Sequence, residues 1–246
     1  MRAEQLVAHR GYRARAPENT RSAIIAAIEA GALFVEIDIQ FSADCQPVIY
    51  HDACMGRVSG IEHADRMVVD HRVDELVRLP ASESERFGVA FEAEKIVTLD
   101  ILNDILFRHP EVHVFLEIKT ASLVRFDRQM LIDALEPYRL QLQKQLVIIS
   151  ADYPLIALAA KANWQRTGVV LNDWMDLQGQ QIKGILPEYV FIDKVALPES
   201  SALDKIASTT VVYEVGDIGE ARALIAAGAD LVETFDIGKL LSASQR

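Results

Sequence analysis

The sequence predicts an α/β fold, and within that class a TIM (β/α)8 barrel with a small insertion after its second strand. Short apolar runs rich in β-branched residues alternate with helical patterns along most of the 246 residues. The alternation gives eight strands, whereas a doubly wound sheet usually has about five or six. The chain shows no linker-like or low-complexity stretch, so we expect one domain over residues 1–246.

The predicted barrel begins with a strand–helix unit near the start of the sequence. Residues 6–9 have the character of a strand, and residues 20–30 form a helical pattern with an apolar stripe. Either Asn19 or Thr20 supplies the N-cap of this helix, and Gly31 marks its end. This unit is the first strand and helix of the expected barrel.

The second barrel strand is expected at residues 33–40. A turn at 43–46 leads to another strand-like run at 47–51, and together the two runs favour a hairpin that extends the second strand. Residues 52–97 are less regular, with mixed charges and one short helical patch. We therefore interpret residues 52–97 as the small insertion.

The rest of the chain alternates helices and strands more regularly. A helix capped by Thr98 is expected first and runs to about residue 108. The remaining strands are expected at residues 113–119, 146–150, 167–171, 189–193, 211–215 and 230–234. The remaining helices are expected at about 127–142, 153–163, 174–183, 199–207 and 217–227.

Composition and charge exclude several classes of protein. With 25 Lys and Arg against 36 Asp and Glu, the net charge of −11 argues against binding to nucleic acid or to anionic membranes. The longest apolar runs, such as AIIAAI at 23–28, are far shorter than the roughly 20 residues of a membrane-spanning helix. The N-terminal segment lacks the apolar region of a signal peptide, so we expect a cytoplasmic protein in which Cys45 and Cys54 are free thiols.

Charged residues end three consecutive strands that are otherwise apolar. Glu36 and Asp38 are two apart in the second strand and share a face, as do Glu117 and Lys119 in the third. Any one such pair is most simply explained as the solvent-exposed face of a strand. In a barrel, however, helices cover the strands on the outside, so neither face of a strand meets solvent at its middle, and the repeated pattern favours a site. Three converging carboxylates repel one another, and a divalent cation with oxygen ligands, Mg²⁺ or Ca²⁺, would relieve the repulsion.

Basic and titratable side chains lie at the same strand ends. Arg10 follows His9 at the end of the first strand, and with Lys119 it could bind a phosphate group beside a metal ion. His9 and His51 both lie at strand ends, where two histidines suit acid–base chemistry near neutral pH. A single histidine is more often structural than catalytic, so the pair and its setting carry this hypothesis.

Four short motifs in order resemble the glycerophosphodiester phosphodiesterase family. They are VAHRG at 7–11, APENT at 16–20, VEIDIQFSADCQPVIYHD at 35–52 and LEIK at 116–119. A weaker match, GADLVETFDIGKL at 228–240, is similar to the closing strand and loop of the family. Each motif alone is weak, but four in this order and spacing are specific.

The resemblance implies a TIM barrel that hydrolyses glycerophosphodiesters to glycerol 3-phosphate and an alcohol, through a cyclic phosphate and with one divalent metal ion, Mg²⁺ or Ca²⁺. The residues carried over by the motifs are the metal ligands Glu36, Asp38 and Glu117, the acid/base pair His9 and His51, the phosphate contacts Arg10 and Lys119, and the supporting residues Glu18 and Asn19. Helix capping explains Asn19 equally well without a role at the site.

The chain departs from the family pattern at three places. Near the end of the seventh strand the family often has Trp-Thr, and this chain has Tyr213-Glu214. The last strand of the family often ends in Thr-Asp, whereas here Phe235 lies between Thr234 and Asp236. The turn that is usually Asp-Gly is Asp44-Cys45 in this chain. Tyr213 and Phe235 could form an apolar wall of the pocket, although ordinary packing explains them as well. The departures bear on which alcohol group is accepted.

Two other functions compete with this interpretation. One is a phospholipase-type phosphodiesterase of the same superfamily, for which the sequence shows no amphipathic or aromatic loop that would face a membrane. The other is a non-catalytic glycerophosphodiester-binding protein, which would not need a pair of acid/base histidines. We expect a small-molecule diester as the partner. Both Mg²⁺ and Ca²⁺ stay open as the metal ion, and so does the oligomeric state.

Overall fold

A computed structural model describes residues 1–198 and 203–243 of the chain. In these residues eight parallel strands close into a barrel, in the order β1-β10-β9-β8-β7-β6-β5-β2, because β1 pairs with both β10 and β2. The barrel strands are β1 (Leu6–Ala8), β2 (Phe34–Phe41), β5 (His113–Ile118), β6 (Leu146–Ser150), β7 (Thr167–Val170), β8 (Tyr189–Asp193), β9 (Thr209–Tyr213) and β10 (Leu231–Thr234). The predicted TIM barrel is confirmed.

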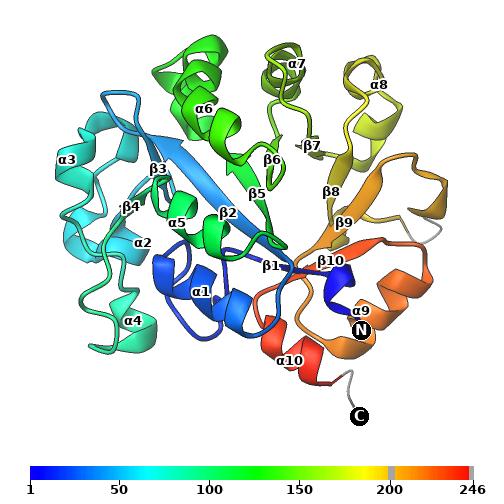
Figure 1. The fold of residues 1–246 in the computed structure, drawn as a ribbon, viewed down its shortest axis with the longest axis horizontal. Coiled ribbons are helices and arrows are strands. Elements are labelled where there is room, and N and C mark those ends of the chain that lie inside the picture. Colours follow the sequence, from blue (N-terminus) through cyan, green and yellow to red (C-terminus); the bar gives the residue numbers. More distant parts are fainter. Residues whose placement is uncertain (199–202, 244–246) are drawn as a thin grey trace.

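Helices surround this barrel, as Figure 1 shows for α6, α7 and α8 beside β5 to β8. The helices outside the insertion are α1 (Arg21–Glu29), α5 (Ile101–Arg108), α6 (Arg128–Leu142), α7 (Tyr153–Lys161), α8 (Gln180–Ile185), α9 (Ile218–Ala226) and α10 (Ile237–Ser242). Several begin with a side-chain cap: Asp127, Asp152 and Asp217 each accept a backbone N–H of the first helical turn.

Two apolar layers hold the barrel together. The larger one packs outward-facing strand residues against the helices, with Val35, Ile37 and Ile39 of β2 fully buried in it. The smaller one fills the barrel interior with inward-facing side chains such as Phe115 and Phe191. Beyond that interior layer, towards the carboxyl ends of the strands, the inward positions of β2 become polar.

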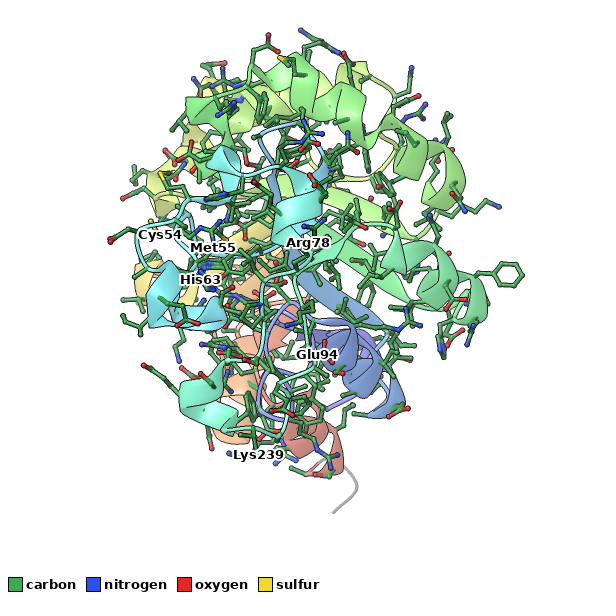
Figure 2. All side chains as sticks on the ribbon, turned by 90° about the vertical axis from the view of Figure 1, so that its left-hand side faces the viewer. Cys54, Met55, His63, Arg78, Glu94 and Lys239 are labelled. Carbon is green, nitrogen blue, oxygen red and sulfur yellow. The ribbon has the colours of Figure 1, made fainter. Side chains whose placement is uncertain are left out.

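The insertion starts from the predicted hairpin. Strand β3 (Pro47–Ile49) runs antiparallel to β2, and β4 (Val97–Thr98) runs antiparallel to β3. The segment between them folds around a small apolar core of its own, which includes Tyr50 and Met55. Its α-helices are α2 (Gly56–Ser59), α3 (Val73–Leu76) and α4 (Ser84–Phe87). Figure 2 looks onto this segment, with Cys54 and His63 on one side of it.

Some predicted elements differ in the structure. The helix expected at 174–183 is broken into a 3-10 turn, Trp174–Gln178, and α8, because Gly179 between them has an extended backbone. Of the helix expected at 199–207, residues 199–202 lie outside the described residues, and the described remainder contains only the 3-10 turn Leu203–Lys205. Thr98 belongs to β4 and does not cap α5.

A last difference lies near the C-terminal end of the described chain, whereas the free thiols agree with the prediction. The short helix α10, capped by Asp236, was not predicted. Within residues 1–198 and 203–243, no helix has both the length and the apolar character needed to cross a membrane. Cys45 is partly buried and Cys54 is exposed, and both are free thiols.

Candidate functional site

The predicted residues converge at the carboxyl end of the barrel. Strands β1, β2 and β5 are neighbours, and Asp38 lies directly beside Glu117 in the β2–β5 register. His9 follows β1 directly, and its backbone N–H bonds to the Thr234 carbonyl of β10 at 2.9 Å. Because all these strands are parallel, their charged C-terminal residues meet at one mouth, where TIM barrels carry their sites.

A cavity of about 230 Å³ opens at this mouth. It is lined by His9, Arg10, Glu36, His51, Glu117, Lys119, Val170, Phe191, Tyr213, Glu214 and Glu233. Seven of the residues singled out from the sequence are therefore in its wall. Phe235 lines a second, adjoining cavity of about 500 Å³, which shares Tyr213 and Glu214 with the first. Asp38, Glu18 and Asn19 support the wall from behind.

Three carboxylates form the core of the site. Glu36, Asp38 and Glu117 each offer an oxygen within 4.8 Å of the others. Glu36 is 2 % exposed, and burial together with the neighbouring charge of Asp38 raises its pKa well above the usual value. The Oε1 atom of Glu36 and the Oδ1 atom of Asp38 have no hydrogen-bond partner in the described part of the chain.

Two basic side chains compensate part of this charge. Lys119 Nζ lies 2.8 Å from Glu117 Oε1 and 3.4 Å from Asp38 Oδ1, and Arg10 Nε lies 3.2 Å from Asp38 Oδ2. Burial of Asp38 opposes its ionisation, but Lys119 and Arg10 outweigh burial and hold the pKa of Asp38 well below its usual value. Lys119 and Arg10 therefore favour the ionised form of Asp38.

Asn19 positions Asp38 and does not cap the first helix. Its Nδ2 donates to Asp38 Oδ2 at 2.8 Å, and its Oδ1 accepts the backbone N–H of Asp38 at 3.0 Å. Its φ of 58° lies in the left-handed region, which asparagine tolerates better than most residues. The N-cap of α1 is instead Thr20, whose hydroxyl accepts the Ala23 N–H at 3.2 Å.

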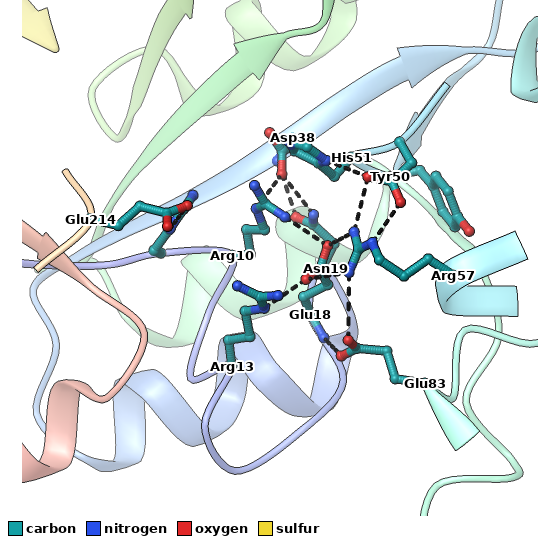
Figure 3. A network of polar contacts seen from close by, with 12 residues as sticks. Arg10, Arg13, Glu18, Asn19, Asp38, Tyr50, His51, Arg57, Glu83 and Glu214 are labelled. Atoms are coloured by element: carbon teal, nitrogen blue, oxygen red, sulfur yellow. Dashed lines mark hydrogen bonds and ion pairs between the residues drawn. The ribbon is translucent and has the colours of Figure 1, made fainter. Parts of the chain in front are cut away.

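Glu18 anchors three arginines beneath the mouth, as Figure 3 shows. Its carboxylate is 1 % exposed and contacts Arg10 NH1 at 2.9 Å, Arg13 Nε at 2.7 Å and Arg57 NH2 at 2.6 Å. Burial works against ionisation, but the hydrogen bonds from Arg57 and the charges of Arg10 and Arg13 lower the pKa of Glu18. Glu18 thus orients Arg10 towards the cavity.

The ring of His51 is oriented by the next residue, Asp52, and Asp52 is in turn held by Arg57 of the insertion. His51 Nδ1 lies 2.6 Å from Asp52 Oδ1, so Nε2 is the ring nitrogen left free. Arg57 of α2 donates from Nε to Asp52 Oδ2 at 2.6 Å and from NH2 to Asp52 Oδ1 at 3.0 Å. The chain Glu18–Arg57–Asp52–His51 therefore connects the loop after β1 to a candidate acid/base group (Figure 3).

His9 faces both the carboxylates and the outer rim. Its Nε2 lies 3.8 Å from Glu36 Oε2 and its Nδ1 lies 3.6 Å from Glu214 Oε1. The ring stacks on Phe235 with centroids 4.7 Å apart, so Phe235 is a packing wall of His9. Burial, reinforced by Arg10, lowers the pKa of His9 well below its usual value, which keeps the imidazole neutral.

Sequence reasoning missed four residues at this mouth. Glu233 carries the same signal as Glu36, an inward charge near the end of a barrel strand, and could have been found in the strand expected at 230–234. Glu214 was noted only as a departure from a motif. Asp52 stood inside a matched motif without an assigned role, and Arg57 gave no signal because its partners are fixed only by the folded insertion.

The carboxylates fit the divalent cation that the sequence implies. Three oxygen donors from three acidic side chains suit a hard ion such as Mg²⁺ or Ca²⁺. Glu36 Oε1 and Asp38 Oδ1 are buried without a hydrogen bond in the described chain, and a cation would satisfy them. This donor set does not discriminate between the two ions.

Comparison with known proteins points to the same family as the sequence motifs. The model of the glycerophosphoryl diester phosphodiesterase family matches residues 9–135. The chain is 35 % identical to YhdW of Bacillus subtilis over 115 residues, which is 46 % of this chain and 44 % of that protein. It is 31 % identical to the glycerophosphodiester phosphodiesterase of Caldanaerobacter subterraneus over 147 residues, 59 % of this chain and 57 % of that protein. The chain thus spans about half the length of these relatives.

The fold also has close structural relatives. The structure of a phosphodiesterase from Oleispira antarctica, in complex with the product sn-glycerol-3-phosphate, superposes with a TM-score of 0.84. The two chains are 24 % identical, and the match covers 98 % of this chain and 97 % of the other. At this identity the similarity establishes the shared barrel.

Proposed function

The chain belongs to the glycerophosphoryl diester phosphodiesterase family, and we propose that it hydrolyses small glycerophosphodiesters to glycerol 3-phosphate and an alcohol with the help of a divalent cation. The observation that carries the proposal is one cavity in which His9 and His51 face a carboxylate cluster and two basic side chains. A cavity of about 230 Å³ suits a small diester.

In the proposed reaction the two histidines move the protons. One accepts the proton of a glycerol hydroxyl as its oxygen attacks phosphorus, and the other donates a proton to the alcohol oxygen as its bond to phosphorus breaks. The product of this step is a cyclic phosphate. Water then opens the ring with the two histidine roles reversed, which yields glycerol 3-phosphate.

Charge in this reaction develops on the phosphoryl oxygens. We assign Arg10 and Lys119 to these oxygens, because their cationic groups already lie at the cavity wall. Glu36, Asp38 and Glu117 would hold the divalent cation, which when bound would withdraw charge from the phosphate and lower the pKa of a glycerol hydroxyl. Glu18 and Asn19 keep Arg10 and Asp38 in place.

The proposal takes residues 1–246 as one cytoplasmic domain that acts on a soluble small molecule. The free thiols of Cys45 and Cys54 are consistent with a reducing compartment. Tyr213 and Phe235 are proposed as walls of the region that receives the alcohol group, since they line the cavity that adjoins the first.

The decisive experiment measures glycerol 3-phosphate release from glycerophosphocholine by the purified protein, with chelator and then with added Mg²⁺ or Ca²⁺. Release that is lost with chelator and restored by a cation supports the proposal. Absence of release from a panel of soluble diesters with each cation contradicts it. Binding without turnover would then identify a binding protein, and turnover of lipid substrates alone would identify a phospholipase-type enzyme.

A further inference from the structure

Glu233 is a buried carboxyl group at the barrel mouth that the proposed reaction does not use. It faces the barrel interior from β10 and is 2 % exposed, and its Oε1 atom has no hydrogen-bond partner among the described residues. An isolated buried carboxylate is unfavourable, so this group calls for a proton or a cation.

His9 and Glu36 lie beside Glu233, and together the three residues favour a cation over a proton at this position. His9, Glu36 and Glu233 each offer a ligand atom, and these atoms lie within 4.8 Å of one another. The three residues come from adjacent strands, because β1 pairs with β10 on one side and with β2 on the other. Buried oxygens of two of them, Glu36 Oε1 and Glu233 Oε1, are without hydrogen-bond partners in the described chain, and His9 Nε2 lies 3.8 Å from Glu36 Oε2.

The donor chemistry of this group differs from that of the first cluster. Glu36, Asp38 and Glu117 supply only oxygen, which suits Mg²⁺ or Ca²⁺. His9 adds a neutral imidazole nitrogen to two carboxylates, and such mixed nitrogen and oxygen sites favour Zn²⁺ and its neighbours in the transition series. Glu36 is the only residue that the two groups share.

We propose that His9, Glu36 and Glu233 form a second cation position that binds Zn²⁺ or a similar transition-metal ion and inhibits the enzyme. Binding there occupies the nitrogen lone pair of His9, which then cannot accept a proton. It also draws Glu36 away from the first cluster. The inhibitory consequence rests on the proposed function, whereas the binding site does not.

The first test measures binding alone. Zn²⁺ is titrated calorimetrically into the protein in a buffer with saturating Mg²⁺, and one Zn²⁺ position is expected. Glu233→Gln and His9→Gln should each weaken its affinity by at least about tenfold. His51→Gln is the matched control, because it removes the other proposed acid/base histidine and leaves the three ligands intact. Unchanged Zn²⁺ affinity in Glu233→Gln overturns the site.

The second test measures inhibition. Zn²⁺ should inhibit Mg²⁺-supported hydrolysis of glycerophosphocholine in the natural protein, and Glu233→Gln should need at least about tenfold more Zn²⁺ to halve its own Zn²⁺-free rate. Equal inhibition of both proteins, or Zn²⁺ bound without inhibition, contradicts the regulatory role. Zn²⁺ bound through Glu233 in a protein that hydrolyses no diester would contradict the proposed function and leave the binding site standing.

Discussion

At the scale of single residues, the site depends on side chains that hold other side chains. Asn19 shows this most directly, since its amide both donates to the Asp38 carboxylate and accepts the Asp38 backbone N–H. If Asp38 is a metal ligand, as proposed, a side chain fixed in this way loses little freedom when a cation binds. The geometry of Asp38 is thus prepared in advance by a residue that does not line the cavity.

Replacing Asn19 should therefore weaken cation binding. We expect Asn19→Ala to lower Mg²⁺ or Ca²⁺ affinity by roughly 10- to 100-fold, measured by calorimetry, because Asp38 loses its orienting partner. Asn163→Ala is the matched control, since Asn163 also has a left-handed backbone, with a φ of 67°, but lies exposed. Equal affinities for the natural protein and Asn19→Ala would show that Asp38 needs no such support.

His51 should be essential for turnover and dispensable for cation binding. Because His51 presents its free Nε2 at the cavity, His51→Ala should lower kcat by roughly 10²- to 10⁴-fold. The measurement is steady-state release of glycerol 3-phosphate from glycerophosphocholine, with His109→Ala as control at a partly exposed histidine outside the cavity. Undiminished kcat in His51→Ala would contradict the acid/base assignment.

At the scale of elements, one side chain of the insertion contacts both the loop after β1 and the neighbour of His51. Arg57 of α2 uses its guanidinium for Glu18 and Asp52 together. With its nitrogens so engaged, Arg57 is a positioning residue and not a phosphate ligand. A segment that looks like a peripheral addition in the sequence is thereby part of the support of His51.

Removal of Arg57 should lower activity through His51. We expect Arg57→Ala to reduce kcat by roughly 10- to 100-fold with a smaller change in KM, since Asp52 loses the partner that fixes it. The effect should be much smaller when Asp52→Asn is already present, because both changes act through the same contact. Arg78→Ala, at an exposed arginine of the same insertion, is the control and should match the natural protein. Additive effects of the two changes would contradict the coupling.

The loop after β1 packs closely against α1 at one glycine. Gly11 has a φ of +77°, and a Cβ added there would lie 2.6 Å from the Ala23 carbonyl carbon. Gly11→Ala should thus lower the free energy of unfolding by about 1–3 kcal/mol or more, measured by urea denaturation. Gly184→Ala, where an added Cβ meets nothing within 4 Å, is the control and should be neutral or stabilising.

The same elements show what the sequence could predict. Residues whose position follows from a strand, such as Glu36, Asp38 and Glu117, were predictable because strand period and parallel topology place them at one mouth. Arg57 was not predictable, because its contacts join the insertion to a loop 39 residues earlier in the chain. The break at Gly179 was missed for a local reason: the helical pattern around it continues on both sides.

At the scale of the whole molecule, the cavity concentrates negative charge inside a closed barrel. Burial is the first cause of the raised pKa values of Glu36, Glu117 and Glu233, and neighbouring carboxylates raise them further. Binding of a cation only to the folded protein stabilises the fold. At a concentration of 100 times Kd the gain is about 2.7 kcal/mol.

Thermal unfolding should consequently depend on the divalent cation. Chelator-treated protein should unfold at a lower temperature than protein with excess Mg²⁺ or Ca²⁺, measured by differential scanning calorimetry. Asp38→Asn should lose most of this difference, because it removes one oxygen ligand and leaves the barrel core unchanged. A cation-dependent rise of the same size in Asp38→Asn would place the stabilising ion elsewhere.

The closure of the barrel through β1 has a consequence for biosynthesis. Strand β1 lies between β2 and β10, so one of its edges can be paired only after residues 231–234 have been made. A nascent or truncated chain that ends before Leu231 leaves the edges of β1 and β9 unpaired, and unpaired edges are sites of aggregation. The proposed catalytic residues His9 and His51 and the proposed metal ligands all precede residue 120, yet the barrel mouth that brings them together closes only when the last strand pairs with the first.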